Sequence, residues 1–306
     1  MAPPSPGSAV PDTLSLPTGH GPRPRASLRR AVNEVLAAVR VAWRIAADVA
    51  IYRLRKREMG NLVTSLTLAL ALGLAPGDLA SRAGFGALLN LFVYLVNDCF
   101  DVGIDLRAPG RDNERTRFLS EHIVAAWATV GALALGLVAW GALHSKGLLL
   151  AALVNVVVIV VYSRVLKHQP VLDLLAMGAW GLSMAMVGFP LDSAVGWRYA
   201  GLLGLLSMVT EAVQVLRDEP SDRAAHVRTT AVVLGPRATA VIARALILTA
   251  TVYAAALLHP LGAVLALGAL VPFDPERANA SWDRLRALFG LTWLALLALL
   301  RWAPHP

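Results

Sequence analysis

The chain has 306 residues, of which 57% are hydrophobic and only 16% charged, and its mean hydropathy is +0.59. A soluble domain is usually nearer half apolar and a quarter charged, so the composition indicates an integral membrane protein. A single cysteine, Cys99, excludes a disulfide scaffold, and the hydrophobicity excludes a collagen-like or disordered chain. The net charge of +8 could indicate nucleic-acid binding. In so apolar a chain we expect it to record orientation across a bilayer instead, with no nucleic-acid partner.

The N-terminal region divides into two parts. Residues 1–26 contain seven prolines and no apolar periodicity, so we expect a disordered tail and not a signal peptide. From residue 27 to 58, apolar residues recur at steps of three and four opposite a basic face. This pattern predicts an amphipathic helix in the membrane interface, with its basic face toward anionic lipids. A helix packed across the cytoplasmic side of the protein would show the same pattern.

The rest of the chain, residues 59–306, consists mainly of apolar segments of the length needed to cross a hydrocarbon core. We place a boundary at His259 and Pro260, because proline breaks a helix interior. The chain then forms an all-α transmembrane catalytic domain of about nine helices. The predicted spans are 59–77, 83–104, 122–144, 147–163, 174–191, 199–217, 238–257, 259–273 and 287–303.

The basic residues predict the orientation of these spans. With the N-terminus in the cytoplasm, thirteen Arg and Lys residues fall in the four cytoplasmic loops, and only Arg82, Lys146 and Arg198 fall in the opposite loops. Cytoplasmic loops carry an excess of such residues, so we expect a cytoplasmic N-terminus. Arginine outnumbers lysine 25 to 3, which is typical of a GC-rich bacterial genome and favours a bacterial plasma membrane.

An acidic motif lies at the cytoplasmic end of the second span. It contains Asn97, Asp98, Asp101 and Asp105. On a helix, the spacings of three and four residues place the three carboxylates on one face. Their repulsion requires a cationic group nearby, and charges at membrane depth are usually functional.

A second acidic motif, Asp218 to Asp222, follows the sixth span, and Pro220 between its two members predicts an irregular backbone. Carboxylates without histidine or cysteine partners suit Mg²⁺ and not zinc. Glu211 lies seven residues upstream on the same helix face. It is either a base in a pocket or a hydrogen-bonding partner of a neighbouring helix, and the sequence leaves both open.

Basic residues are expected on the same side of the membrane as the two acidic motifs. Carboxylates that hold Mg²⁺ beside Arg and Lys form a diphosphate site, and an apolar cavity above it would hold a hydrocarbon tail. The implied substrate is an isoprenoid diphosphate. Topology alone also requires bases in these loops, so we expect about half of the candidates to touch phosphate. The candidates are Arg117, Arg164, Lys167, Arg223 and Arg228.

The motifs resemble those of the UbiA superfamily of intramembrane prenyltransferases, with Asn-Asp-x-x-Asp-x-x-x-Asp at residues 97–105 and Asp-x-x-x-Asp at residues 218–222. The resemblance implies a ring of about nine helices around a central cavity, with Mg²⁺ and the diphosphate at its cytoplasmic mouth. It implies that Asp98, Asp101, Asp218 and Asp222 are catalytic. The implied metal ligands are Asn97, Asp98, Asp101, Asp105, Asp218 and Asp222, and the implied substrate-binding residues are Asn97, Arg117, Tyr162, Arg164, Lys167, Arg223 and Arg228.

Three functions remain open at this stage. The first is transfer of an isoprenyl group to a lipophilic acceptor, namely an aromatic ring, a lipid hydroxyl or another polyene. The second is a UbiA-type terpene cyclase, favoured by two departures from the family pattern: Phe118 in place of proline, and a short stretch between Tyr162 and Lys167. The third is a transporter or structural helical protein, which is disfavoured because the carboxylates lie at the interface and not at the bilayer midplane.

Overall fold

The computed structural model describes residues 24–107, 113–273 and 277–303. The chain divides into two units, residues 1–40 and 41–306. The described part of the first unit is the beginning of helix α1, Pro24–Arg55, which starts within the predicted tail because proline suits the first helical position. The rest of that tail, residues 1–23, lies outside the described residues. An interfacial position for α1 stays a prediction.

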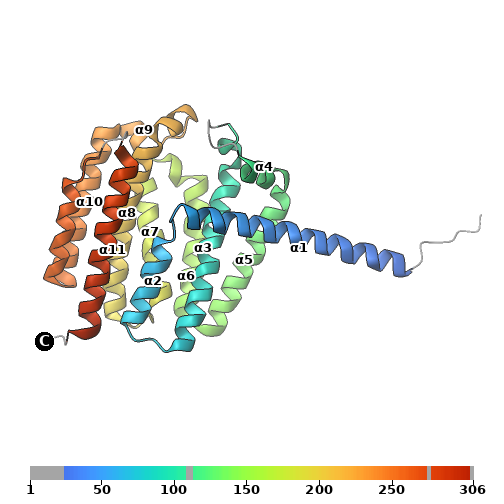
Figure 1. Cartoon of the computed structure of the whole chain (residues 1–306), viewed down its shortest axis with the longest axis horizontal. Helices are drawn as coiled ribbons and strands as arrows, with labels where there is room; N and C mark the ends of the chain where they lie inside the picture. The colour runs from blue at the N-terminus through green and yellow to red at the C-terminus, as the bar shows by residue number, and fades with distance from the viewer. Residues whose placement is uncertain (1–23, 108–112, 274–276, 304–306) are drawn as a thin grey trace, which may run out of the picture. The chain divides into compact units, whose positions relative to one another are not determined.

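The second unit is helical in its described part. Six helices are long and apolar enough to cross a membrane by length and composition (Figure 1). Three shorter apolar helical segments complete the correspondence with the nine predicted spans, although the number that cross the bilayer stays a prediction. The long helices are α3 (Pro76–Asp105), α5 (Ile123–His144), α6 (Lys146–Arg164), α8 (Ala194–Ala224), α10 (Pro236–Leu257) and α11 (Ala278–Trp302). The shorter segments are α2 (Gly60–Ala71), α7 (Leu172–Ala185) with η2 (Met186–Gly188), and η3 (Pro260–Leu270).

Short elements and capping residues define the ends of the long helices. The connecting elements are α4 (Glu114–Glu121), η1 (Leu166–His168) and α9 (Thr230–Leu234). The side chains of Ser145 and Ser193 accept hydrogen bonds from backbone amides in the first turns of α6 and α8. Gly235, with a φ of +85°, separates α9 from α10, and Pro236 then opens α10. These residues satisfy or avoid the free amides of a helix start, so the sequence itself sets where α6, α8 and α10 begin.

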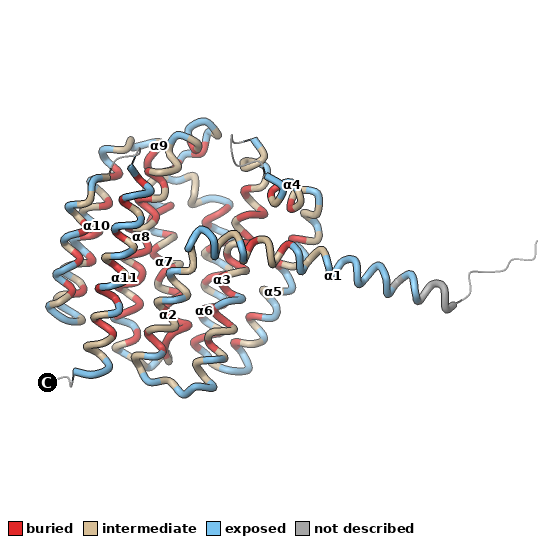
Figure 2. The backbone as a smooth tube through the Cα atoms, viewed as in Figure 1, coloured by how far each residue is buried: buried red, intermediate tan, exposed pale blue. Residues whose placement is uncertain are grey.

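Helix α8 lies inside the bundle and α5 lies at its surface. In the most apolar 18-residue window of each helix, 72% of α8 but only 17% of α5 is buried. Figure 2 shows buried residues on the inward faces of the helices and exposed residues on the outward faces. On α5, Val124 is 81% exposed and Leu143 is 84% exposed. Large apolar side chains arranged in this way suit contact with lipid chains and not with water.

Helix α8 continues through Pro220 to Ala224, so the prediction of an irregular backbone there was wrong. The proline lacks the amide that would bond the carbonyl four residues earlier. The loss is a single bond near the end of a long helix that packs against α7, α10 and α11. The hydroxyl of Ser221 also donates to the carbonyl of Asp218, at 2.8 Å. Asp218 and Asp222 therefore lie one turn apart on a regular helix.

Glycines allow α7 to approach α8 closely. A Cβ atom on Gly181 would lie 2.1 Å from Ser207 Oγ and 2.9 Å from the carbonyl of Leu203. We expect Gly181→Ala to lower the free energy of unfolding by about 1–3 kcal/mol, because the helices would have to move apart. A fall in the thermal unfolding midpoint of the detergent-solubilised protein would show it. Gly131→Ala on α5, where nothing lies within 4 Å, is the matched control and should not lower the midpoint.

Candidate active site

The first acidic motif forms the last two turns of α3. Asp98 is 4% exposed and Asp101 is 9% exposed. The Asn97 amide donates to Asp101 Oδ2 at 2.9 Å, because residues four apart meet on one face of a helix. The helix ends at Asp105, so the three carboxylates lie together where α3 meets its following loop.

The two acidic motifs line one polar cavity of about 480 Å³. The cavity brings the end of α3 together with the end of α8, more than 100 residues later in the chain. The ends of α1, α6 and η1 contribute Arg53, Tyr162 and Lys167. Eight of the predicted site residues therefore share this cavity: Asn97, Asp98, Asp101, Asp105, Tyr162, Lys167, Asp218 and Asp222.

Basic side chains compensate the clustered carboxylates. Arg53 and Arg115 each donate to a different oxygen of Asp98, at 2.5 Å. Lys167 Nζ lies 2.5 Å from Asp101 Oδ2. Burial by itself would lower the pKa of Lys167, but the Asp101 carboxylate raises it above its ordinary value. The ammonium group therefore stays protonated at neutral pH and is available to an anionic ligand.

The Arg53 guanidinium fixes the end of α1 to the site. It donates to Glu58, in the turn after α1, at 2.7 Å, and its central carbon lies 4.3 Å from the centroid of the Tyr94 ring. The Arg115 guanidinium lies in the same way over Tyr52, at 4.2 Å. Each cation is thus held by both a carboxylate and an aromatic face.

The structure does not bring four of the predicted phosphate-binding residues to this cavity. Arg117, Arg164, Arg223 and Arg228 are exposed and do not line it. Arg223 pairs instead with Glu219, one turn earlier on α8.

Three other arginines line the cavity and were missed by sequence reasoning: Arg53, Arg115 and Arg217. Arg115 could have been chosen over Arg117 from the pattern of α4. Arg115 lies one turn before the buried Leu119, so the two share a helix face, and Arg117 lies on another face. Nothing in the sequence near Arg53 connects it to Asp98, because the pair joins residues 45 positions apart.

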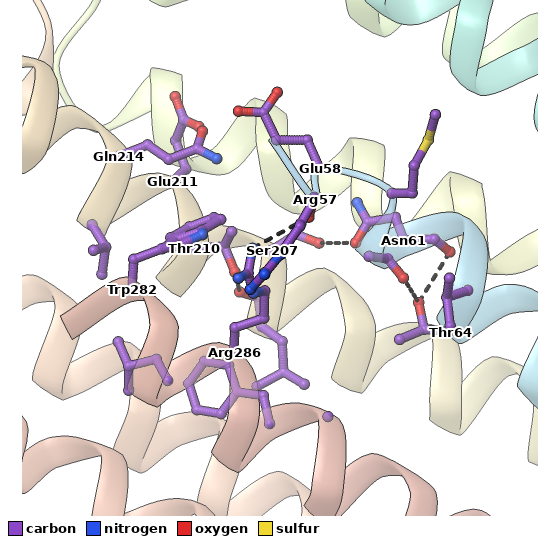
Figure 3. Close-up of a pocket in the computed structure, with 18 of the residues that line it drawn as sticks. Arg57, Glu58, Asn61, Thr64, Ser207, Thr210, Glu211, Gln214, Trp282 and Arg286 are labelled. Carbon is purple, nitrogen blue, oxygen red and sulfur yellow. Dashed lines mark hydrogen bonds between the residues drawn. The ribbon is translucent and has the colours of Figure 1, made fainter. Parts of the chain in front are cut away.

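An apolar cavity of about 820 Å³ adjoins the polar one (Figure 3). It lies among α2, α8 and α11, and its apolar lining includes Leu203, Leu206, Trp282, Phe289 and Trp293. The two cavities share six lining residues, so the polar cavity and the apolar cavity lie side by side. The shared residues are Glu58, Tyr94, Met177, Trp180, Glu211 and Gln214.

Of the two alternatives that the sequence left open for Glu211, the structure shows the hydrogen bond between helices, and the role of a base stays a prediction. Glu211 accepts a hydrogen bond from the Tyr162 hydroxyl of α6 at 3.0 Å, which links two neighbouring helices. It also faces both cavities. Figure 3 shows it beside Gln214, toward the same upper side of the view as Glu58.

The donor set of the polar cavity fits a hard cation. Five aspartates and the Asn97 amide surround one space, and Mg²⁺ prefers such oxygen ligands. In the described part of the chain, no three acidic, histidine or cysteine side chains converge as a metal-binding group. Asp98 and Asp101 instead contact Arg53, Arg115 and Lys167. A metal ion would compete with these basic groups for the same oxygens.

Comparison with known proteins agrees with this arrangement. The model of the UbiA prenyltransferase family matches residues 61–273. The C(50) beta-cyclic carotenoids biosynthesis protein LbtBC of Dietzia sp. (strain CQ4) is 30% identical over a match of 279 residues, which covers 81% of this chain but only 64% of that protein. The lycopene elongase/hydratase of Haloferax volcanii is 30% identical over 241 residues, or 74% of this chain and 75% of that protein.

Solved structures share the fold. A UbiA homolog from Archaeoglobus fulgidus bound to DMAPP and Mg²⁺ gives a TM-score of 0.62 at 16% identity, covering 82% of this chain and 99% of that one. A UbiA homolog from Aeropyrum pernix K1 gives a TM-score of 0.57 at 21% identity, covering 80% of this chain and 95% of that one. The predicted all-α membrane fold is therefore confirmed.

Proposed function

The chain belongs to the UbiA prenyltransferase family and is an integral membrane protein, and we propose that it transfers the prenyl group of an isoprenyl diphosphate to a lipophilic acceptor with the help of Mg²⁺. One observation carries the proposal: a cavity lined by carboxylates and bases lies directly beside a larger apolar cavity and shares six lining residues with it. A diphosphate head and a hydrocarbon tail need two such spaces in direct contact.

The polar cavity supplies groups for the diphosphate. Asn97 and the five aspartates would hold Mg²⁺, which when bound offsets the negative charge of the departing diphosphate. Lys167, Arg53 and Arg115 donate hydrogen bonds to the remaining phosphate oxygens. The excess of bases in the four predicted cytoplasmic loops supports a cytoplasmic mouth for this cavity.

The apolar cavity supplies the space for the prenyl chain and the acceptor. Breaking the allylic C–O bond leaves a carbocation, which water would destroy. Trp180 and Tyr94 stand where the two cavities meet, and their ring faces favour a positive charge. The similarity to a carotenoid biosynthesis protein and to a lycopene elongase/hydratase supports a linear polyene such as lycopene as the acceptor.

A direct assay tests the proposal. The purified protein in liposomes is given Mg²⁺, lycopene and, in turn, dimethylallyl, geranyl, farnesyl and geranylgeranyl diphosphate. We expect diphosphate release together with a prenylated lycopene detected by mass spectrometry, and loss of both when EDTA is added. A cyclic hydrocarbon formed from a diphosphate alone would identify a terpene cyclase, which the aromatic lining of the apolar cavity would also suit. Absence of diphosphate release with every donor would refute both functions.

A further inference from the structure

Glu211 is a carboxylate inside the bundle, on α8, at the junction of the two cavities. Its residue is 5% exposed. In the described part of the chain, its hydrogen-bonding partner is the Tyr162 hydroxyl, at 3.0 Å from Oε1, and no Arg or Lys forms an ion pair with it. It differs in this from Asp98 and Asp101, each of which contacts a basic side chain.

A buried carboxylate without an ion-pair partner binds a proton more readily than an exposed one, which suits a group that accepts a proton during the reaction. Lining both cavities, Glu211 borders the diphosphate space and the hydrocarbon space at once. The Tyr162 hydroxyl engages Oε1 and thereby orients the carboxylate, which leaves Oε2 for a ligand. A cation that forms between the two cavities would therefore lie close to this carboxylate.

We propose that Glu211 takes the proton that is released when prenyl transfer ends. The C1–O bond of the prenyl diphosphate breaks first, and its electron pair leaves with the diphosphate. The π electrons of an acceptor double bond then form a bond to C1 of the allylic cation. The positive charge then resides on the acceptor carbon next to the new bond. Glu211 removes a proton from the adjacent carbon, and the C–H electron pair becomes a new double bond.

The carboxylic acid so formed gives its proton to an oxygen of the diphosphate, which leaves with it, and the Glu211 carboxylate is restored. The inference rests on the proposed function, since it concerns the final step of prenyl transfer. It assigns the carboxylates of the polar cavity to ionisation and Glu211 to proton removal, so the two roles can be separated by measuring diphosphate and product independently.

The test is Glu211→Gln, which keeps the size of the side chain and its ability to accept from Tyr162 but removes the base. With dimethylallyl diphosphate, lycopene and Mg²⁺ in liposomes, we expect diphosphate release within about threefold of the wild type. The alkene product should fall at least about tenfold, replaced by the alcohol that forms when water captures the cation. Glu211→Asp, which withdraws the carboxylate by one methylene, should give an intermediate mixture and provides the readout if Glu211→Gln does not fold.

The matched control is Glu219→Gln, the same change two turns further along α8 at a residue that lines neither cavity. It should keep the wild-type ratio of alkene to alcohol. A proportional fall of diphosphate release and product in Glu211→Gln, or a wild-type mixture from both Glu211 variants, would overturn the inference and leave the proposed function standing. So would an alcohol as the wild-type product. Absence of diphosphate release from the wild type would overturn the proposed function and the inference with it.

Discussion

Asp101→Asn is expected to lower the rate of diphosphate release by about a thousandfold, or ~4 kcal/mol in the activation free energy. The residue is 9% exposed, and its Oδ2 lies 2.5 Å from Lys167 Nζ. Asparagine fills the same volume, but it removes the negative charge that would hold Mg²⁺ and that keeps the Lys167 ammonium in place. Both effects act on the leaving diphosphate, which explains the size of the expected loss.

The measurement is coupled detection of diphosphate from liposomes that contain purified variant and Mg²⁺. Asp192→Asn is the matched control, because Asp192 is exposed before α8 and lines neither cavity. It should retain the wild-type rate. Undiminished release by Asp101→Asn, in a variant that elutes as the wild type does, would refute the assignment of the site.

Arg53→Gln is expected to lower the free energy of unfolding by about 3–5 kcal/mol and to reduce diphosphate release as well. Arg53 contacts Asp98 at 2.5 Å and Glu58 at 2.7 Å. Losing the guanidinium leaves carboxylates in a largely buried region with fewer positive charges, which is more costly than losing an exposed ion pair. The end of α1 would also lose its main polar connection to α3.

The shift of the thermal unfolding midpoint in detergent reports this effect. All variants are compared at one fixed scan rate, because membrane proteins often unfold irreversibly. Arg55→Gln removes the same charge two residues later, at an exposed position. Its effect should stay within about 0.5 kcal/mol. Equal shifts of the unfolding midpoint in the two variants would show that the contact between Arg53 and Asp98 contributes nothing specific.

The agreement between sequence and structure is greatest where the reasoning depends on neighbours along the chain. The apolar segments predicted the long helices, since a bilayer requires about 20 apolar residues with all backbone groups paired internally. The spacing of Asp98, Asp101 and Asp105 predicted a shared helix face. Asn97 lies one turn before Asp101, and its bond to Asp101 agrees with that spacing. At Pro220 the local rule was wrong, because the proline removes a single backbone hydrogen bond near the end of a long helix.

The sequence by itself determined the helical class, the membrane setting and the acidic face at the end of α3, because each depends on composition or on a spacing of three to four residues. The acidic face on α8 required the structure, since the sequence predicted an irregular backbone at Pro220. Only the tertiary structure decided which cations meet those faces. Lys167 reaches Asp101 and Arg53 reaches Asp98, while Arg117 and Arg164 remain exposed outside the cavity. A residue's position along the chain sets its angle on its own helix. Which angle faces the cavity depends on how α1, α4 and α6 pack against α3, and those contacts join residues that are far apart in sequence.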